Sequence, residues 1–360
     1  MTRVADPRRN AIVELMRVPA EGHDELWLQE ALQQAVILEL ATLPPYLCGL
    51  WSIVDEDQGS DVFRAIRTIV FDEMSHMGLA CNMLTTIGGV PRIADGGLVP
   101  VYPGPLPGGV QPDLTVSLMR LSTEALDMYS HIERPEDAVV QGLHEPEPTS
   151  IGAFYQAILD AFRARPELIR GTRQLTRNMS SHGEGNDIVP LTSLEDVEAA
   201  VQIIKEQGEG TTVSPENPFP GDTGELAHFY TFRELFHGRR LIRVPDDPTG
   251  FAFQGDQIPL PRTLPMGTVP RGGWEEGGVP VPDEVRTKLD TFNRRYSALL
   301  RFLERAWQEE QPNTAAQMLG RAVGQMFALE GPARDLMRIP LPDGSGDTYG
   351  PEFRYVAEEP

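Results

Sequence analysis

Residues 66–84 read IRTIVFDEMSHMGLACNML, and this stretch decides the fold class. Apolar residues recur in it at three- and four-residue steps, which is the period of an amphipathic helix. Glu73 and His76 fall within the same apolar stripe. A carboxylate is rarely buried without a partner, because its desolvation costs several kcal/mol. The stretch therefore predicts a core helix that carries buried ionisable side chains.

Two other segments repeat this pattern. A helix expected over about Asp24–Val54 places Glu39 in a stripe of Leu and Ala side chains. A helix expected over about Gly224–Phe236 places Glu225 and His228 on one face. A Glu three residues before a His projects to the same side of a helix, so the pair can chelate one ion. Both segments therefore predict metal ligands in the core.

A third Glu-x-x-His pair is formed by Glu234 and His237. Glu234 follows Glu225 by nine residues, which turns it to the opposite face of the helix. We therefore discount this pair as a source of ligands.

Two Glu-x-x-His pairs, together with one Glu from each of two further helices, form the ligand set of di-iron and di-manganese helical bundles. Carboxylate and imidazole suit iron or manganese, and the lack of thiolates argues against a structural zinc site. Two iron ions (Fe2+/Fe3+) are the expected cofactors, with manganese as the alternative. The predicted metal ligands are Glu39, Glu73, His76, Glu225, His228 and either Glu206 or Glu209.

The sequence does not decide which Glu supplies the ligand from the fourth helix of the bundle. Glu206 and Glu209 lie at the end of a weakly periodic segment, and Glu124 or Glu133 could replace them. Pro44 and its neighbour Pro45 raise a second alternative, because they either kink the first core helix or start a new one.

The rest of the chain predicts an all-α protein, a four-helix bundle with additional helices and long Pro/Gly-rich loops, because strand signals are almost absent. We expect a metal-binding bundle over residues 1–243, and a loop with C-terminal helices over 244–360, packed together as one compact unit. The other expected helices span about Leu114–Ile132, Ile151–Arg165, Leu194–Gln207, Asp283–Glu309 and Asn313–Met337; the expected loops span Pro100–Pro112 and Val244–Pro282.

Composition excludes several classes of partner. The 360-residue chain has 53 acidic and 31 basic residues and a net charge of -22. Such a surface repels phosphate backbones and anionic lipid, so neither nucleic acid nor a membrane is an expected partner. The N-terminus lacks a signal peptide, no apolar run approaches the roughly 18 residues of a membrane span, and Cys48 and Cys81 suggest no disulfide framework. We expect a cytoplasmic protein.

Six motifs along the chain carry a resemblance to a known family: LELATLPPYL at 38–47, DEMSHM at 72–77, IGGVP at 87–91, EQGEG at 206–210, ELAHFY at 225–230 and GPEF at 350–353. Together they resemble the ferritin-like domain family associated with iminophenylpyruvate dimer synthases of violacein- and rebeccamycin-type biosynthesis, in a stand-alone form. The resemblance implies a ferritin-like metal-binding bundle linked to secondary metabolism, and it favours Glu209 slightly over Glu206. One departure is Ala153, where the family often has a Glu, so no ligand is expected there.

These patterns favour a di-iron oxidase or oxygenase that uses dioxygen to act on a small metabolite, with amino-acid-derived compounds as the candidates. Tyr46, Tyr230 and Thr42 are the candidate catalytic or pocket residues beside the metals. An iron-binding protein with ferroxidase activity and no organic substrate is the first alternative. A metal-free interaction module of the same fold is the second. A monomer or small homo-oligomer is expected.

Overall fold

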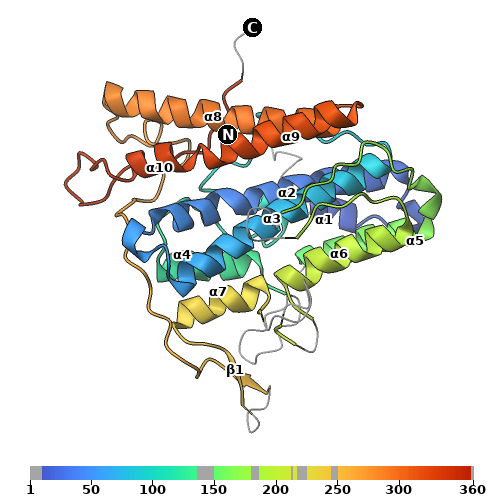
Figure 1. Cartoon of the computed structure of the whole chain (residues 1–360), viewed down its shortest axis with the longest axis horizontal. Helices are drawn as coiled ribbons and strands as arrows, with labels where there is room; N and C mark the ends of the chain where they lie inside the picture. The colour runs from blue at the N-terminus through green and yellow to red at the C-terminus, as the bar shows by residue number, and fades with distance from the viewer. Residues whose placement is uncertain are drawn as a thin grey trace, which may run out of the picture.

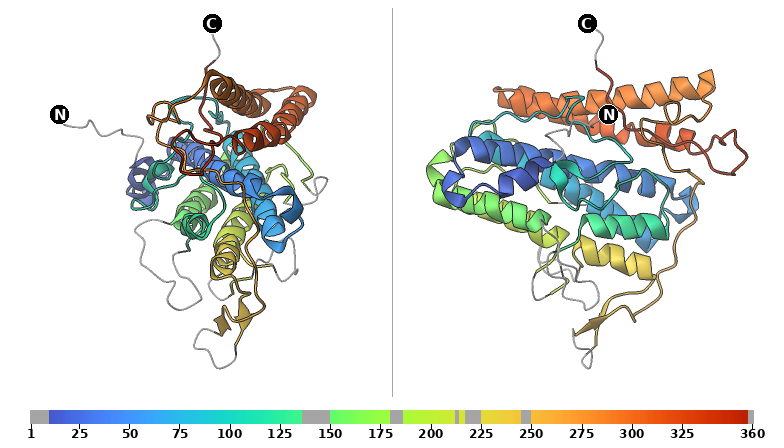
Figure 2. Two further views of the ribbon diagram at one scale, coloured as in Figure 1. Left: turned by 90° about the vertical axis from the view of Figure 1, so that its left-hand side faces the viewer. Right: turned by 180° about the vertical axis from the view of Figure 1, so that it is seen from behind.

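The computed structural model describes residues 10–135, 150–179, 186–211, 214–216, 225–244 and 250–357. Its helices form three stacked layers, with the pair α2–α3 in the middle (Figure 1; Figure 2). Helical residues dominate the described chain, so the all-α prediction is confirmed. All the Glu and His residues that were predicted as metal ligands lie within the described ranges.

The middle layer is an antiparallel pair of long helices, α2 (Glu25–Ser52) and α3 (Asp61–Thr86). Each begins at a capping side chain: Asp24 accepts from the backbone N–H of Trp27, and Ser60 does so from that of Phe63. These caps satisfy backbone donors that have no partner inside a helix. The two helices are covered on both sides, which explains why apolar residues surround Glu39 and Glu73.

Helix α2 continues through Pro44 and Pro45 without interruption. Proline has no N–H, so Pro45 leaves the carbonyl of Ala41 without its usual helical donor. The hydroxyl of Tyr102 donates to that carbonyl over 2.7 Å. A side chain from the loop at 88–122 therefore completes the helix, and the alternative of a new helix starting on proline is wrong.

Among the described residues, the lower layer is made of four shorter helices. They fill two helix positions of the bundle, and each position holds two short helices placed end to end, which we call half-helices. Helix α4 lies beside α7, and α5 beside α6 (Figure 1; Figure 2). Their bounds are α4 (Thr123–Ile132), α5 (Ile151–Ala164), α6 (Leu194–Gly208) and α7 (His228–His237). The expected helix over Leu114–Ile132 is thus shorter than predicted, because Ser122 caps it by accepting from the N–H of Ala125.

The upper layer consists of α8 (Asp283–Gln308) and α9 (Pro312–Phe327), followed by the short α10 (Glu330–Leu336). The expected single helix over Asn313–Met337 is therefore split in two. Between the lower and upper layers the chain runs as a long irregular segment with one small hairpin, in which β1 (Ile242–Arg243) pairs antiparallel with β2 (Phe251–Ala252). A short N-terminal helix, α1 (Ala11–Met16), precedes the bundle, and 3-10 turns lie at Ala20–Gly22, Asp55–Asp57, Pro107–Gly109 and Pro166–Leu168.

The C-terminal residues fasten the upper layer. Glu352 accepts 2.8 Å hydrogen bonds from the backbone N–H of Trp274 and from the side-chain amide of Asn293. Phe353 then packs its ring against Trp51 of α2 and Phe292 of α8. The predicted division of the chain into residues 1–243 and 244–360 falls at the end of β1 and stays a prediction.

Among the described residues, one helix is long and apolar enough to cross a membrane. This is α2, with 28 residues, so the expectation that no apolar run approaches such a length is wrong. The apolar part of α2 is buried inside the protein throughout. A helix that is apolar on all sides is typical of a core position, and the layers on both sides of α2 provide that core.

Candidate metal centre

A group of buried carboxylates and imidazoles lies where the middle of α2 and α3 faces the gaps between the half-helices. Glu39 comes from the middle of α2, and Glu73 and His76 from the middle of α3. Glu133 directly follows the last residue of α4 and caps it, and His228 is the first residue of α7. All these residues are at most 6% exposed.

These residues form two groups that share Glu73. In the first, Nδ1 of His76 lies 3.3 Å from Oε1 of Glu73 and 3.9 Å from Oε2 of Glu39. In the second, Nδ1 of His228 lies 3.1 Å from the same Oε1 of Glu73 and 3.9 Å from Oε2 of Glu133. Within each group the potential ligand atoms all lie within 4.8 Å of one another. The arrangement has an ion-sized centre on either side of one carboxylate.

Each potential ligand is held by a partner on its far side. This is the arrangement in which outer contacts orient metal ligands and fix the imidazole tautomer. In both His residues Nε2 makes the outer contact, so Nδ1 points at the carboxylates. The hydroxyl groups of Tyr155, Thr42 and Tyr46 donate to the carboxylates of Glu39, Glu73 and Glu133, respectively. Nε2 of His76 lies 2.8 Å from the amide oxygen of Gln207, and Nε2 of His228 lies 3.3 Å from the carboxylate of Asp72.

The geometry around His228 fits a bound ion better than a direct contact. Its Nδ1 is buried and has no hydrogen-bond partner among the described residues, although Oε1 of Glu73 is only 3.1 Å away. An ion that binds nitrogen and oxygen at about 2.0–2.2 Å holds neighbouring ligand atoms roughly 3 Å apart. Two ligands of one ion do not aim at each other. These residues therefore fit a cation between His228 and Glu73. Nδ1 of His76 lies at a similar distance, 3.3 Å, from the same Glu73 oxygen.

The pKa values of the group reflect crowding of carboxylates in an apolar core. Burial and the charge of Glu73 raise the pKa of Glu39 to about 8, and burial raises that of Glu133 to about 7. Burial acts on Glu73 too, but its contacts with His228 and His76 outweigh it and hold the pKa of Glu73 well below its usual range. The contacts with Glu73 also raise the pKa of His76 to about 9, against the effect of burial. Protons therefore balance the charge here when no cation does.

A sequence model of the family described as Ferritin-like matches residues 32–237, which is more than half of the chain. The chain belongs to the ferritin-like family. The predicted ferritin-like bundle is thereby confirmed, and the matched range ends with α7.

The crystal structure of a ferritin-like protein from Caulobacter vibrioides is similar to this chain over 91% of this chain and 97% of the other. The TM-score is 0.59 and the sequence identity is 22%, so this likeness concerns the fold alone. No curated protein matches the sequence.

Glu225 does not lie where a ferritin-like Glu-x-x-His motif would put it. Helix α7 begins only at His228, with Ala227 as its cap, so Glu225 precedes the helix and is exposed. Leu226 is already paired with Glu216 as an extended bridge. The prediction that Glu225 faces the core is therefore wrong, because helical spacing does not apply ahead of the first turn.

The remaining Glu candidates separate clearly in this ferritin-like bundle. Glu133 is buried in the second group, whereas Glu124 is exposed on the first turn of α4. Glu206 is half-buried and accepts from the amide of Gln202. Glu209 accepts a 2.7 Å hydrogen bond from the N–H of Gly152 at the start of α5. The open alternative Glu133 thus occupies the position predicted for Glu206 or Glu209.

Glu209 nevertheless lines the same small cavity as Glu39, Glu73, His76 and Glu133, with about 20 Å³ open to a water-sized sphere. That volume admits about one water molecule. Glycine at residue 152 lets the Glu209 carboxylate approach closely, because a Cβ there would force that carboxylate to move. Glu209 is therefore a neighbour of the two groups without belonging to either.

Of the candidate pocket residues, Thr42 and Tyr46 contact the carboxylates directly, as described above. Tyr230 does not line the cavity; it packs in a separate apolar cluster with Phe229 and Leu241. Glu234 and His237 also lie elsewhere: Glu234 accepts from Arg240, and His237 stacks on Phe253.

Three contacting residues escaped sequence analysis: Tyr155, Gln207 and Asp72. Tyr155 lies two residues after Ala153, the position that drew attention only because it lacks a Glu. Asp72 directly precedes Glu73, and Gln207 lies between Glu206 and Glu209. Adjacency to a predicted ligand was the available signal, but adjacency does not tell which neighbour turns inward.

Proposed function

We propose that this ferritin-like protein is a di-iron enzyme that uses dioxygen to oxidise a small organic substrate. The observation that carries the proposal is the pair of buried groups on either side of Glu73, in which every potential ligand has an outer contact. A buried cluster of three carboxylates is unfavourable without compensation by cations. Metal binding is the compensation that this donor set favours.

Iron is the proposed metal because the donors are carboxylate oxygens and imidazole nitrogens, with no thiolate among the described groups. The chemistry that a bound iron pair supplies is the reduction of dioxygen. Glu73 belongs to both groups and would be a ligand to both ions, Glu39 and His76 would hold one of them, and Glu133 and His228 the other. Tyr155 and Tyr46 would fix the outer carboxylates through their hydroxyl protons.

Access to the centre supports an organic substrate. The small cavity beside the carboxylates shares Gly152, Lys205 and Glu209 with an open groove of about 810 Å³ between α5 and α6. The ammonium group of Lys205 donates to the side chain of Gln156 on the groove wall. The groove is lined by the cations Arg163 and Lys205 and by four carboxylates, Asp160, Glu198, Glu206 and Glu209. A lining with both charges suits a substrate that carries both an ammonium group and a carboxylate, which agrees with an amino acid.

Several finer expectations belong to this proposal. The motifs shared with the iminophenylpyruvate dimer synthase group support a role in secondary metabolism. The upper layer of α8 and α9 covers one face of the bundle (Figure 2), which favours a monomer or small oligomer over a hollow shell. The acidic composition supports a cytoplasmic location with no nucleic-acid or membrane partner.

Aerobic oxidation of Fe(II) tests the proposal. Protein is mixed with a large excess of Fe(II) in air, and formation of Fe(III) is followed by absorbance against a protein-free blank. Oxidation should stop after about two irons per chain, the number that a di-metal bundle holds. Glu73→Gln should abolish this phase, and Glu124→Gln, at the exposed site on α4, should retain it. Protein that goes on to oxidise hundreds of irons and stores a mineral core would instead be a ferroxidase without organic substrate.

A substrate screen completes the test. Iron-loaded protein is supplied with a reductant and a panel of amino acids and their 2-oxo acids, and oxygen consumption is measured. We expect at least one compound to raise consumption in the wild type but not in Glu73→Gln. No response across the panel, together with the two-iron limit, would remove the organic acid as substrate class.

A further inference from the structure

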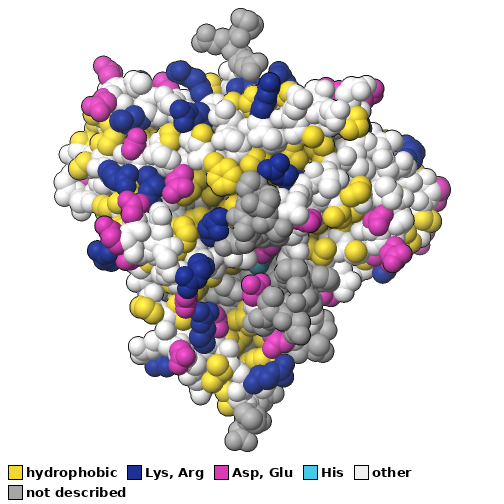
Figure 3. Space-filling model, in the orientation of Figure 1, with side chains coloured by type: hydrophobic (Ala, Val, Ile, Leu, Met, Phe, Trp, Pro, Cys, Tyr) yellow, Lys and Arg dark blue, Asp and Glu magenta, His cyan; other side chains and the backbone are white. Residues whose placement is uncertain are grey.

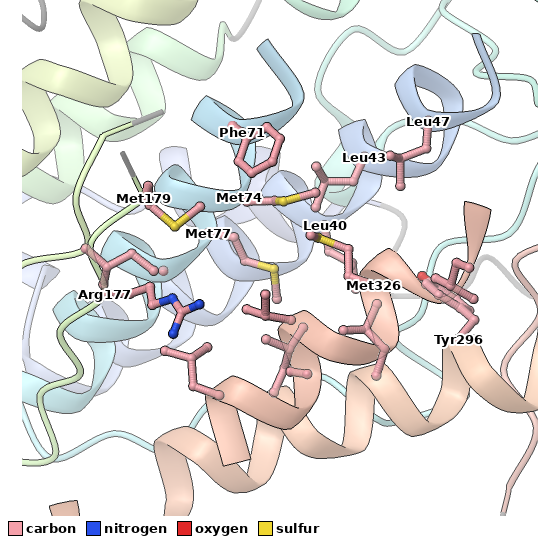
Figure 4. A pocket seen from close by; sticks show the side chains of 18 of the residues that line it. Leu40, Leu43, Leu47, Phe71, Met74, Met77, Arg177, Met179, Tyr296 and Met326 are labelled. Carbon is pink, nitrogen blue, oxygen red and sulfur yellow. The ribbon is translucent and has the colours of Figure 1, made fainter. Parts of the chain in front are cut away.

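A second cavity lies between the middle and upper layers. It has a volume of about 90 Å³ and is bounded by α2 and α3 on one side and by α8 and α9 on the other. Apolar side chains line it almost throughout, among them Leu40, Leu43, Met74, Met77 and Met326 (Figure 4). Hydrophobic side chains also gather on the surface along the seam between these layers (Figure 3).

This cavity is separate from the metal centre. Leu40 directly follows Glu39 in α2, and Met74 directly follows Glu73 in α3. One residue turns a helix by about 100°, so these neighbours point to different faces. The carboxylates face the lower layer, whereas the Leu and Met side chains face the upper one. Anything bound in this cavity would be divided from the metals by the α2–α3 pair.

The lining includes a buried tyrosine hydroxyl that has no partner among the described residues. Tyr296 of α8 is 3% exposed, and its hydroxyl makes no hydrogen bond within the described residues. Figure 4 shows the hydroxyl directed into the cavity, at the end opposite to Arg177. A buried hydroxyl without a partner destabilises the folded state, and phenylalanine would fill the same space without that loss. The hydroxyl therefore points to a ligand that satisfies it.

The walls can adapt to such a ligand. Four methionines line the cavity: Met74, Met77, Met179 and Met326. Methionine is unbranched and polarizable, so it changes shape at little energetic cost and suits surfaces that admit apolar molecules. An apolar cavity of somewhat larger size is known to stay dry and to bind benzene.

We propose that this cavity binds a ring-sized apolar molecule with a single hydrogen-bonding group, which pairs with the Tyr296 hydroxyl. The site goes beyond the proposed di-iron function and does not depend on it. Its ligand enters along the seam between α2–α3 and α8–α9, and its ring lies among the Leu and Met side chains.

Phenol and toluene provide a matched test, because they have the same ring and nearly the same shape and only phenol has a hydroxyl. Both are titrated into the full-length protein by calorimetry. Both should bind saturably, with phenol the tighter. In Tyr296→Phe the preference for phenol should fall about fivefold, the value of one net hydrogen bond. Absence of saturable binding of both compounds, or an unchanged preference in Tyr296→Phe, would overturn the proposal.

Filling the cavity gives an independent test. Ala322 is buried in the lining, and Ala322→Leu should weaken binding of both compounds at least tenfold. Val323→Phe, at a half-buried lining position, serves as the second variant if the first does not fold. Leu26→Ala, at a site that is 74% exposed, should bind both compounds as the wild type does. Undiminished binding in the filled variants would place the compounds elsewhere and contradict the assignment.

The melting temperature of ligand-free protein completes the design. Tyr296→Phe should melt at the same temperature as the wild type or higher, because it removes an unpartnered buried hydroxyl. A clear fall in melting temperature would show that the hydroxyl has a structural partner, and would remove the reason for expecting a ligand.

Discussion

Glu39 and His76 project from the middle of two long unbroken helices, whereas Glu133 and His228 stand at the ends of two short ones. The first group, with Glu39 and His76, and the second, with Glu133 and His228, are the two halves of the candidate metal centre. Their side chains and distances are nearly the same, but the helices that carry them differ. The first half is fixed by α2 and α3, which pack along their whole length. The second half depends on where α4 ends and α7 begins. The same donor geometry can therefore be built from helix interiors or from helix termini.

Loss of Glu73 is predicted to have the largest effect, because this carboxylate belongs to both halves. Glu73→Ala should reduce bound iron from about two per chain to near zero. Metal analysis after anaerobic loading and desalting measures the change, with circular dichroism to show that the helices remain. A variant that retains one iron would mean that the halves do not share this residue.

Loss of one outer carboxylate is predicted to empty only one half. Glu39→Ala and Glu133→Ala should each retain about one iron per chain by the same analysis. Glu225→Ala is the matched control, because that side chain is exposed ahead of α7 and should leave the stoichiometry unchanged. If Glu225→Ala lost an iron and Glu133→Ala did not, the helix-end half would be built from the wrong Glu.

Replacing the tyrosines that contact the outer carboxylates should have a smaller effect on iron binding. Tyr155 holds Glu39 in the first half, and Tyr46 holds Glu133 in the second. Replacing an outer partner typically costs 10- to 100-fold in metal affinity, so Tyr155→Phe and Tyr46→Phe should each weaken iron binding by about that factor without lowering the final stoichiometry. Competition with a chelator measures the affinity. We expect the larger loss for Tyr46→Phe, since the helix-end half has less support from its scaffold. Equal losses would mean that the scaffold makes no difference.

The smallest predicted effect is on the stability of the metal-free protein. The pKa of Glu39 is raised to about 8 and that of His76 to about 9. Both groups bind protons more tightly in the folded state, so their contribution is full at low pH and is lost as the pH rises through these values. Glu133, raised to about 7, acts in the same direction. The melting temperature of the metal-free protein should fall between pH 5 and 9.

Glu39→Gln should flatten that decline, because it removes one of the titrating groups. Bound metal should reverse it, since the ion displaces protons from its ligands into the solvent and therefore binds more tightly as the pH rises. A melting temperature that rises with pH in the metal-free protein would contradict the assignment of these protons.

The difference between the halves also explains what could be predicted from the sequence. The recurrence of apolar residues at three- and four-residue steps located α2 and α3. It also placed Glu39, Glu73 and His76 at core positions of these helices. His228 was found through its spacing from Glu225, although that spacing is not helical in the structure. Glu133 remained an alternative because it lies at the end of its helix, where the spacing of apolar residues no longer tells which way a side chain points. The break between α6 and α7 had no signal that would separate Glu209 from the ligands.

The contacts on the far side of the ligands were predicted only in part. Thr42 and Tyr46 follow Glu39 by three and seven residues, which keeps them on its face of α2. Tyr155, Gln207 and Asp72 depend on how separate helices meet, which no local pattern determines. The apolar cavity under the upper layer is of the same kind, since two helix pairs far apart in the chain, α2–α3 and α8–α9, supply most of its walls.

The central claim is that two ions flank Glu73, one in each half. Anaerobic titration with Fe(II), followed by removal of free metal and elemental analysis of the folded protein, tests this most directly. The claim predicts saturation at about two irons per chain. Saturation at zero or one iron per chain, in protein whose helices are intact, would contradict it.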